Sequence, residues 1–228
     1  MTYYATHPQS YYGQGDVTAE FVGLARAARE KSLDDLPHIH FNGAGGNVAA
    51  GKYNDGSPEM RPVLTRRMSD SMRTAWEATQ RVPVKAADAE WRVTKVALPL
   101  SEHFDVEELE SMLTAKDTDA ATRQWAARAL AFLRRIRTGH QIELSCLRIK
   151  SVYLVHMPGE LFVEYQLAAQ AMRPNDTVCM AAYGDYGPFY IGTEIAYGQG
   201  GYETSSRSSF VAPQVEKVLS DGMRRLLK

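Results

Sequence analysis

The chain has 228 residues, of which 44% are hydrophobic and 23% are charged, and its formal net charge is -1. This composition is typical of a soluble globular protein with one domain, or alternatively two small ones, and it argues against a nucleic-acid partner. Two cysteines, Cys146 and Cys179, are too few for a disulfide framework. The sequence contains neither a transmembrane segment nor an export signal in the chain as given, so the compartment stays open.

The first 80 residues predict two short strands and two helices. The strands cover residues 3–6 and 37–41, a loop runs through Gly15 after the first, and a glycine-rich loop covers residues 42–58 after the second. Long loops of this kind are usually functional or mobile. The apolar stripes of the two helices are Val17, Phe21, Leu24 and Ala25, after an N-cap at Asp16, and Val63, Met68, Met72 and Trp76, within residues 62–80.

The remaining residues predict an alternation of strands and helices. Strands are expected over residues 91–98, 141–149, 151–156 and 177–183, and helices over residues 160–172 and 213–227 with two more within residues 101–137. The second of the two helices predicted within residues 101–137 has a stripe of residues expected to be buried: Trp125, Ala129, Phe132, Leu133 and Ile136. Interleaved strands and helices indicate a layered α/β fold, with a mixed sheet flanked by helices.

One glycine-rich motif resembles a nucleotide site. Residues 46–52 match the first seven positions of a phosphate-binding P-loop after a predicted strand. The eighth position is Tyr53 instead of Ser or Thr, and a turn signal at residues 54–56 occupies the place where the phosphate-binding helix should begin. Nucleotide binding is therefore a minor alternative. A serine hydrolase has no local support, because the nucleophile motif Gly-X-Ser-X-Gly is absent from the sequence.

Three short segments place a metal-competent side chain beside Gly or Pro. His7 ends the first predicted strand, Glu160 opens a predicted helix whose positive end favours the carboxylate, and Tyr202 follows two glycines in a loop. Each also has a plain structural explanation: a strand end, a complement to the helix dipole and packing over glycines. Composition and spacing by themselves favour these plain explanations.

The same segments, in this order and at roughly this separation, resemble the neutral ceramidases, including ceramidase-like bacterial proteins. In that family a histidine after a strand, a glutamate in a Pro-X-Glu-aromatic motif and a tyrosine in a Tyr-Glu pair are zinc ligands. The corresponding segments here are residues 5–10, residues 158–162 with the aromatic residue one place later, and Tyr202–Glu203. Residues 42–47 resemble the family's Asn/Gly-rich loop, so the similarity spans almost the whole chain.

The resemblance implies that residues 1–228 form a single α/β domain, equivalent to the C-terminal part of a ceramidase catalytic domain and incomplete by itself. The family's first zinc-binding histidine, together with a neighbouring histidine and an arginine, should lie upstream of the strand that ends at His7. We therefore expect one zinc ligand to be missing. The sequence also departs from the family after Glu203, at residues 204–207, and we expect residues 1–228 to hold no counterpart of the C-terminal immunoglobulin-like domain of the larger ceramidases.

The function that the resemblance implies is zinc-dependent hydrolysis of an amide bond in a small-molecule or lipid-like substrate such as a sphingolipid. One zinc ion would be held by His7, Glu160, Tyr202 and the upstream histidine, and Glu160 and Tyr202 would take part in catalysis. Zinc lowers the pKa of its bound water to about 7, which provides a nucleophile at neutral pH. Further candidates for the surroundings of the site are Asn42, Asn47, Lys52, Asp55 and Glu203.

The alternative function is a binding module that keeps the pocket without turnover. Loop tyrosines suit the stacking of a polar or glycan-like ligand, although they equally suit packing over glycines; these are Tyr11, Tyr12, Tyr53, Tyr186 and Tyr190. An incomplete domain would also expose an apolar sheet edge, so we expect self-association.

Overall fold

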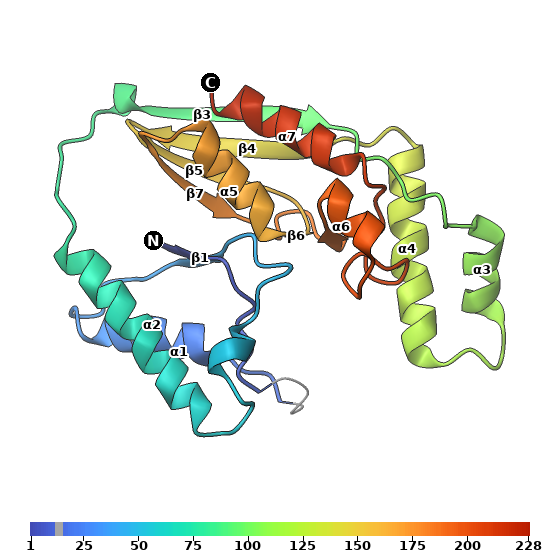
Figure 1. The fold of residues 1–228 in the computed structure, drawn as a ribbon, viewed down its shortest axis with the longest axis horizontal. Coiled ribbons are helices and arrows are strands. Elements are labelled where there is room, and N and C mark those ends of the chain that lie inside the picture. Colours follow the sequence, from blue (N-terminus) through green and yellow to red (C-terminus); the bar gives the residue numbers. More distant parts are fainter. Residues whose placement is uncertain (12–15) are drawn as a thin grey trace.

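A mixed four-stranded sheet forms the centre of the computed structural model, which describes residues 1–11 and 16–228 (Figure 1). The strands follow the order β3-β4-β5-β7, in which β4 pairs antiparallel with β3 and β5, and β7 pairs parallel with β5. Their bounds are β3 (Ala89–Val96), β4 (Ile142–Ile149), β5 (Val152–His156) and β7 (Thr177–Ala181).

Two helices, α5 (Val163–Met172) and α7 (Val215–Leu226), cover one face of this sheet (Figure 1). Side chains alternate between the two faces of a strand, so β3 directs Val96 into the core beneath α7 while Trp91 and Val93 point the other way. Trp91 and Val93 are 58% and 44% exposed on this edge strand. The exposed apolar surface fits the expected self-association, which stays a prediction.

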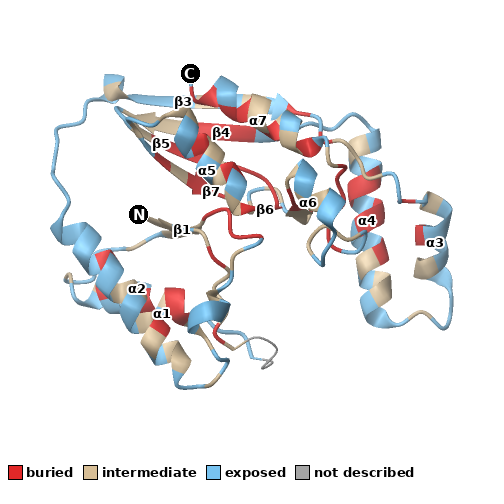
Figure 2. Ribbon diagram, viewed as in Figure 1, coloured by how far each residue is buried: buried red, intermediate tan, exposed pale blue. Residues whose placement is uncertain are grey.

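A helical pair stands beside the sheet. It consists of α3 (Val106–Thr114) and α4 (Ala120–Arg137), and each begins at an aspartate whose side chain accepts backbone N–H groups, Asp105 and Asp119. The buried stripe of α4 contains Ala129, Phe132 and Leu133, as its spacing predicts. Figure 2 shows the buried residues concentrated in α4, the sheet and the helices on the sheet.

The N-terminal part has a small apolar cluster of its own. Helices α1 (Glu20–Lys31) and α2 (Met60–Glu77) pack together through Phe21, Val22 and Leu64. Two parallel strands, β1 (Thr2–Tyr4) and β2 (His40–Asn42), lie between this pair and β7 (Figure 1). A 3₁₀ helix, η1 (Ala50–Tyr53), interrupts the predicted loop, and a second one, η2 (Ala86–Asp88), precedes β3.

Three short elements complete the fold: β6 (Glu160–Leu161), β8 (Tyr190–Ile191) and α6 (Glu194–Gln199). Strands β6 and β8 pair in parallel, with Glu160 opposite Tyr190. Both cysteines are free thiols. No helix among the described residues is long and apolar enough to cross a membrane.

The layered α/β class with a mixed sheet is confirmed, while several local predictions are wrong. The helix expected from residue 160 begins at Val163, because the backbone of residues 160–161 pairs with β8 instead. The first strand ends at Tyr4. Three residues of the predicted helical stripes are solvent-exposed. Val17 precedes α1, which begins at Glu20 and not after an N-cap at Asp16. Leu24 and Trp76 lie outside the narrow face that α1 and α2 bury against each other. Tyr12 and the end of the predicted loop, residues 13–15, lie outside the described residues.

Candidate functional site

A buried glycine loop joins the N-terminal segment to strand β6. Residues 43–46 are buried between the segment that carries His7 and strand β6. The Gly46 N–H donates to the Leu161 carbonyl at 2.7 Å, and the His7 N–H donates to the Val48 carbonyl at 2.9 Å. The loop therefore holds His7 against β6 although 153 positions separate His7 from Glu160.

His7 and Glu160 form the centre of the site. The distance from His7 Nε2 to Glu160 Oε2 is 3.0 Å, and the side chains are 15% and 9% exposed. Two tyrosines complete the cluster: the Tyr190 hydroxyl lies 3.3 Å from His7 Nε2, and the Tyr186 hydroxyl donates to Glu160 Oε1. Glu160 is thus a strand residue surrounded by donors, and its ionised form is stabilised by side chains instead of by the predicted helix start.

The hydrogen bond on the far side of the His7 ring fixes its protonation. His7 Nδ1 lies 3.1 Å from the Val48 carbonyl oxygen, which can only accept, so Nδ1 carries a proton. In the neutral ring Nε2 is then unprotonated, and its lone pair faces the Glu160 carboxylate. Two acceptors at this distance repel each other, so the pair requires either a second proton on the ring or a cation.

Without a metal, the electrostatics favour an imidazolium–carboxylate pair. The hydrogen bond from His7 to Glu160 raises the pKa of His7 above 6.5, against the opposing effect of burial. Burial by itself would raise the pKa of Glu160, but hydrogen bonds from His7, Tyr186 and Tyr190 lower it overall. Burial raises the pKa of both Tyr186 and Tyr190. The hydrogen bond to Glu160 raises the pKa of Tyr186 further, and the Glu160 charge raises that of Tyr190, so both groups stay protonated donors.

The opposite pKa shifts predict how this pair affects stability. The raised pKa of His7 stabilises the fold fully below its unfolded value near 6.5, and this contribution disappears as the pH rises through the folded-state pKa. The lowered pKa of Glu160 stabilises the fold above its unfolded value of 4.5, and this contribution disappears as the pH falls through the folded-state pKa. In chelator, the difference in melting temperature between wild type and His7→Gln should therefore be largest between these values and shrink at alkaline pH. A difference that does not change with pH would refute the ion pair.

Tyr202 lies at the outer rim of the cluster. Its ring centroid is 6.0 Å from that of Tyr190, which in turn lies 6.2 Å from the His7 ring. Its side chain is 69% exposed, and the backbone before it turns at Gly200 and Gly201, which both have positive φ angles. The fold thus brings His7 and Glu160 into contact and places Tyr202 one ring away, while the ligand role of each stays a prediction.

The two asparagines expected near the site form backbone connections. The Asn42 carbonyl accepts the Ala182 N–H at 3.0 Å and so ties β2 to the end of β7. Asn47 Oδ1 accepts the Val163 N–H at 2.8 Å, and its Nδ2 donates to Glu164 at 2.9 Å. Asn47 therefore accepts, from outside the helix, a backbone N–H group of the first turn of α5 that has no partner within the helix.

The three charged candidates lie in different surroundings. Lys52 is exposed beside Tyr53, with its Nζ 5.3 Å from the ring centroid. Asp55 accepts the Ser57 N–H at 2.9 Å in an exposed turn. Glu203 is half-buried, and among the described residues it has no hydrogen bond or ion pair. The helix that a P-loop requires is replaced by the four-residue η1 and this turn.

Zinc fits the central pair in donor type and spacing. Nitrogen and oxygen ligands bind zinc at about 2.0–2.2 Å, so two tetrahedral ligands lie about 3.3 Å apart, close to the observed 3.0 Å. The hydrogen bond from Nδ1 also fixes the tautomer of His7 that leaves Nε2 free to bind a metal. In known metal sites, the second ring nitrogen of a histidine ligand usually makes such a hydrogen bond. The part of the chain that the structure describes holds no group of three or more His, Cys, Asp or Glu residues that could bind a metal.

Sequence reasoning did not assign Tyr186 and Tyr190 to the centre of the site. Both belonged to a general set of loop aromatics suited to stacking. Tyr190 reaches His7 because β8 pairs with β6, and strands of two residues leave almost no periodic signal in a sequence. The only available signal was the density of tyrosine and glycine in residues 183–192.

The fold and this cluster define a layered α/β protein with a histidine–glutamate pair joined by a buried glycine loop. Its fold is shared with neutral ceramidases. A structure described as "Ceramidase complexed with C2" superposes with a TM-score of 0.69 at 13% identity, covering 99% of this chain and 44% of that chain. Neutral ceramidase from Pseudomonas aeruginosa superposes with a TM-score of 0.66 at 16% identity, covering 99% and 43%.

The predicted resemblance is therefore confirmed at the level of the fold. The chain spans less than half the length of these solved chains. No protein-family model and no curated protein matches the sequence.

Proposed function

We propose that this chain is part of a zinc-dependent amide hydrolase of the ceramidase type, and that it forms one side of the metal site as a single domain. The observation that carries the proposal is the His7–Glu160 pair, in which His7 Nε2 lies 3.0 Å from a carboxylate oxygen while Nδ1 is held by the Val48 carbonyl. The shared fold supports it. One zinc ion bound between the two groups would polarise a carbonyl and activate water.

The residues of the chain have distinct roles in this proposal. The Val48 carbonyl orients the His7 ring, and the hydrogen bond from Tyr186 keeps Glu160 ionised and in position. Tyr190 is a protonated donor beside both groups, suited to hold an oxygen atom of the substrate. Tyr202 supplies the third donor from its exposed loop, by moving past the Tyr190 ring.

The test is zinc-dependent release of fatty acid from a short-chain ceramide. The resemblance implies a further histidine ligand, so the reaction is run with added zinc and imidazole, which supplies a second nitrogen donor. We expect slow hydrolysis that chelator abolishes and that Glu160→Gln reduces by about 100-fold or more. His140→Ala is the matched control, because His140 is exposed and contacts Arg135 instead of the site.

If zinc binds to the His7–Glu160 pair but no fatty acid is released under any of these conditions, the hydrolase is refuted. The binding module would then be the better description. The contact of Tyr186 and Tyr190 with the pair is the observation that favours it.

A further inference from the structure

A large apolar groove lies between helix α2 and strand β1. Its volume is about 960 Å³, which is in the range of pockets that enclose small molecules. The segment around His7 forms one wall, through Thr6 and Val48, while the His7–Glu160 contact itself is outside the lining. The groove is therefore a separate space next to the candidate metal site.

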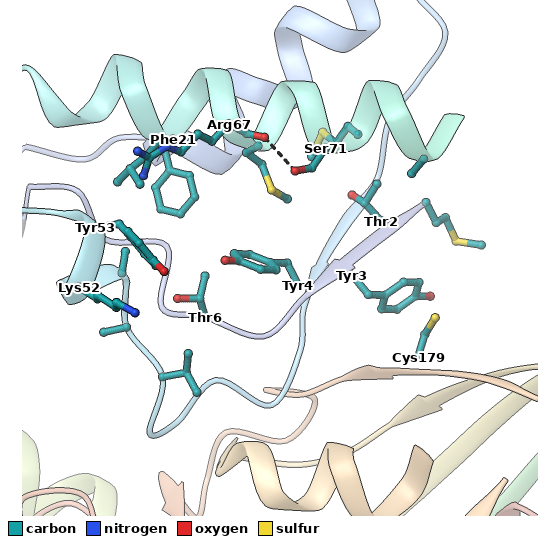
Figure 3. A pocket seen from close by; sticks show the side chains of 18 residues that line it. Thr2, Tyr3, Tyr4, Thr6, Phe21, Lys52, Tyr53, Arg67, Ser71 and Cys179 are labelled. Carbon is teal, nitrogen blue, oxygen red and sulfur yellow. Dashed lines mark hydrogen bonds between the residues drawn. The ribbon is translucent and has the colours of Figure 1, made fainter. Parts of the chain in front are cut away.

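The groove has an apolar interior. Side chains from α1 and α2 line one side of the space, and side chains from β1 line the opposite side (Figure 3). The apolar lining includes Phe21, Leu64, Met68 and Met72. Methionines are flexible and adapt to chains of different shape, which suits an alkyl ligand.

One end of the groove carries two cations. Lys52 Nζ lies 5.3 Å from the centroid of the Tyr53 ring, and the Arg67 guanidinium carbon lies 5.7 Å from the same centroid. Neither cation forms a salt bridge with any residue that the structure describes. In Figure 3 the Lys52 ammonium and the Tyr53 and Thr6 hydroxyls point towards the same part of the groove.

We propose that this groove binds an anionic single-chain amphiphile, with a long-chain carboxylate as its simplest form. The alkyl chain lies along the methionines of α2, and the carboxylate lies at the end of the groove that carries Lys52, Tyr53 and Arg67. A neutral lipid would leave both cations without a partner. The proposal goes beyond the hydrolase, because it requires neither a bound metal nor turnover.

The test is equilibrium binding of fatty acids of increasing length to the whole chain in chelator, below their critical micelle concentrations. Each added methylene should tighten binding by about threefold to fourfold, until the groove is full. Dodecanol should bind more weakly than laurate, and only laurate binding should weaken with salt.

Lys52→Met and Arg67→Met remove one charge each and keep an apolar stem on an exposed position. Each should weaken laurate binding by up to about fivefold, and the double variant by more. Arg66→Met is the matched control, because Arg66 is an exposed neighbour on α2 outside the lining.

The proposal is overturned if laurate and dodecanol bind equally or if the double variant binds laurate like the wild type. It is also overturned if laurate fails to bind while light scattering shows a dimer that substitutions in the groove dissociate. That last result would assign the groove to contact between copies. The binding assays contain chelator and so do not depend on zinc. Their outcome therefore stays the same whether or not the chain is a zinc-dependent hydrolase.

Discussion

His7→Ala should lower the affinity of the chain for zinc by at least about 100-fold. Loss of a hydrogen-bonded partner behind a metal ligand typically costs 10–100-fold, and loss of the ligand itself costs more. Glu160→Gln should have a comparable effect, because it removes the charged oxygen 3.0 Å from His7 Nε2 and keeps the shape of the side chain. Tyr202→Phe should have a smaller effect, since Tyr202 is exposed and one ring away.

The measurement is calorimetric titration of zinc at two pH values, with circular dichroism to show that each variant is folded. Zinc has to displace the second proton on the His7 ring, so affinity should increase as the pH rises through the raised pKa of His7. His140→Ala should bind like the wild type. If His7→Ala binds zinc with unchanged affinity, the metal site is elsewhere or absent.

Gly46→Ala should destabilise the fold by about 1–3 kcal/mol, the usual range for forcing extra atoms into a packed interior. A methyl group at Gly46 would lie 2.5 Å from the Glu160 carbonyl oxygen and 2.9 Å from that of Leu161. Both are backbone atoms, so β6 itself has to move. The shift would also stretch the 2.7 Å hydrogen bond from Gly46 to Leu161 and separate His7 from Glu160.

Chemical denaturation gives the loss of stability, and zinc titration of the folded variant gives the accompanying loss of affinity. Gly51→Ala is the matched control in the adjoining 3₁₀ helix η1, because nothing lies within 4 Å of its added methyl group and its φ angle is not positive. Equal midpoints for the two variants would show that the glycine loop is not the connection between His7 and β6.

The interleaved periodicities determined the layered α/β class from the sequence. Strong signals came from long elements: the apolar stripe of α4 was predicted within residues 101–137, and the bounds of α7 were predicted to within two residues. The order of four motifs, at His7, residues 42–47, Glu160 and Tyr202, also sufficed to indicate the fold that the solved ceramidases share. These features depend on local patterns, which a sequence displays directly.

The site depended on contacts that no local pattern contains. Glu160 was expected at a helix start, but pairing of two residues with β8 made it a strand residue and brought Tyr190 to His7. The apolar groove arises because α2 packs on α1 and faces β1 across a gap. Periodicity reports which face of an element is apolar, whereas the partner of that face is decided by the energy of the whole packed chain. Tertiary structure therefore decided which donors surround Glu160 and where an apolar ligand fits.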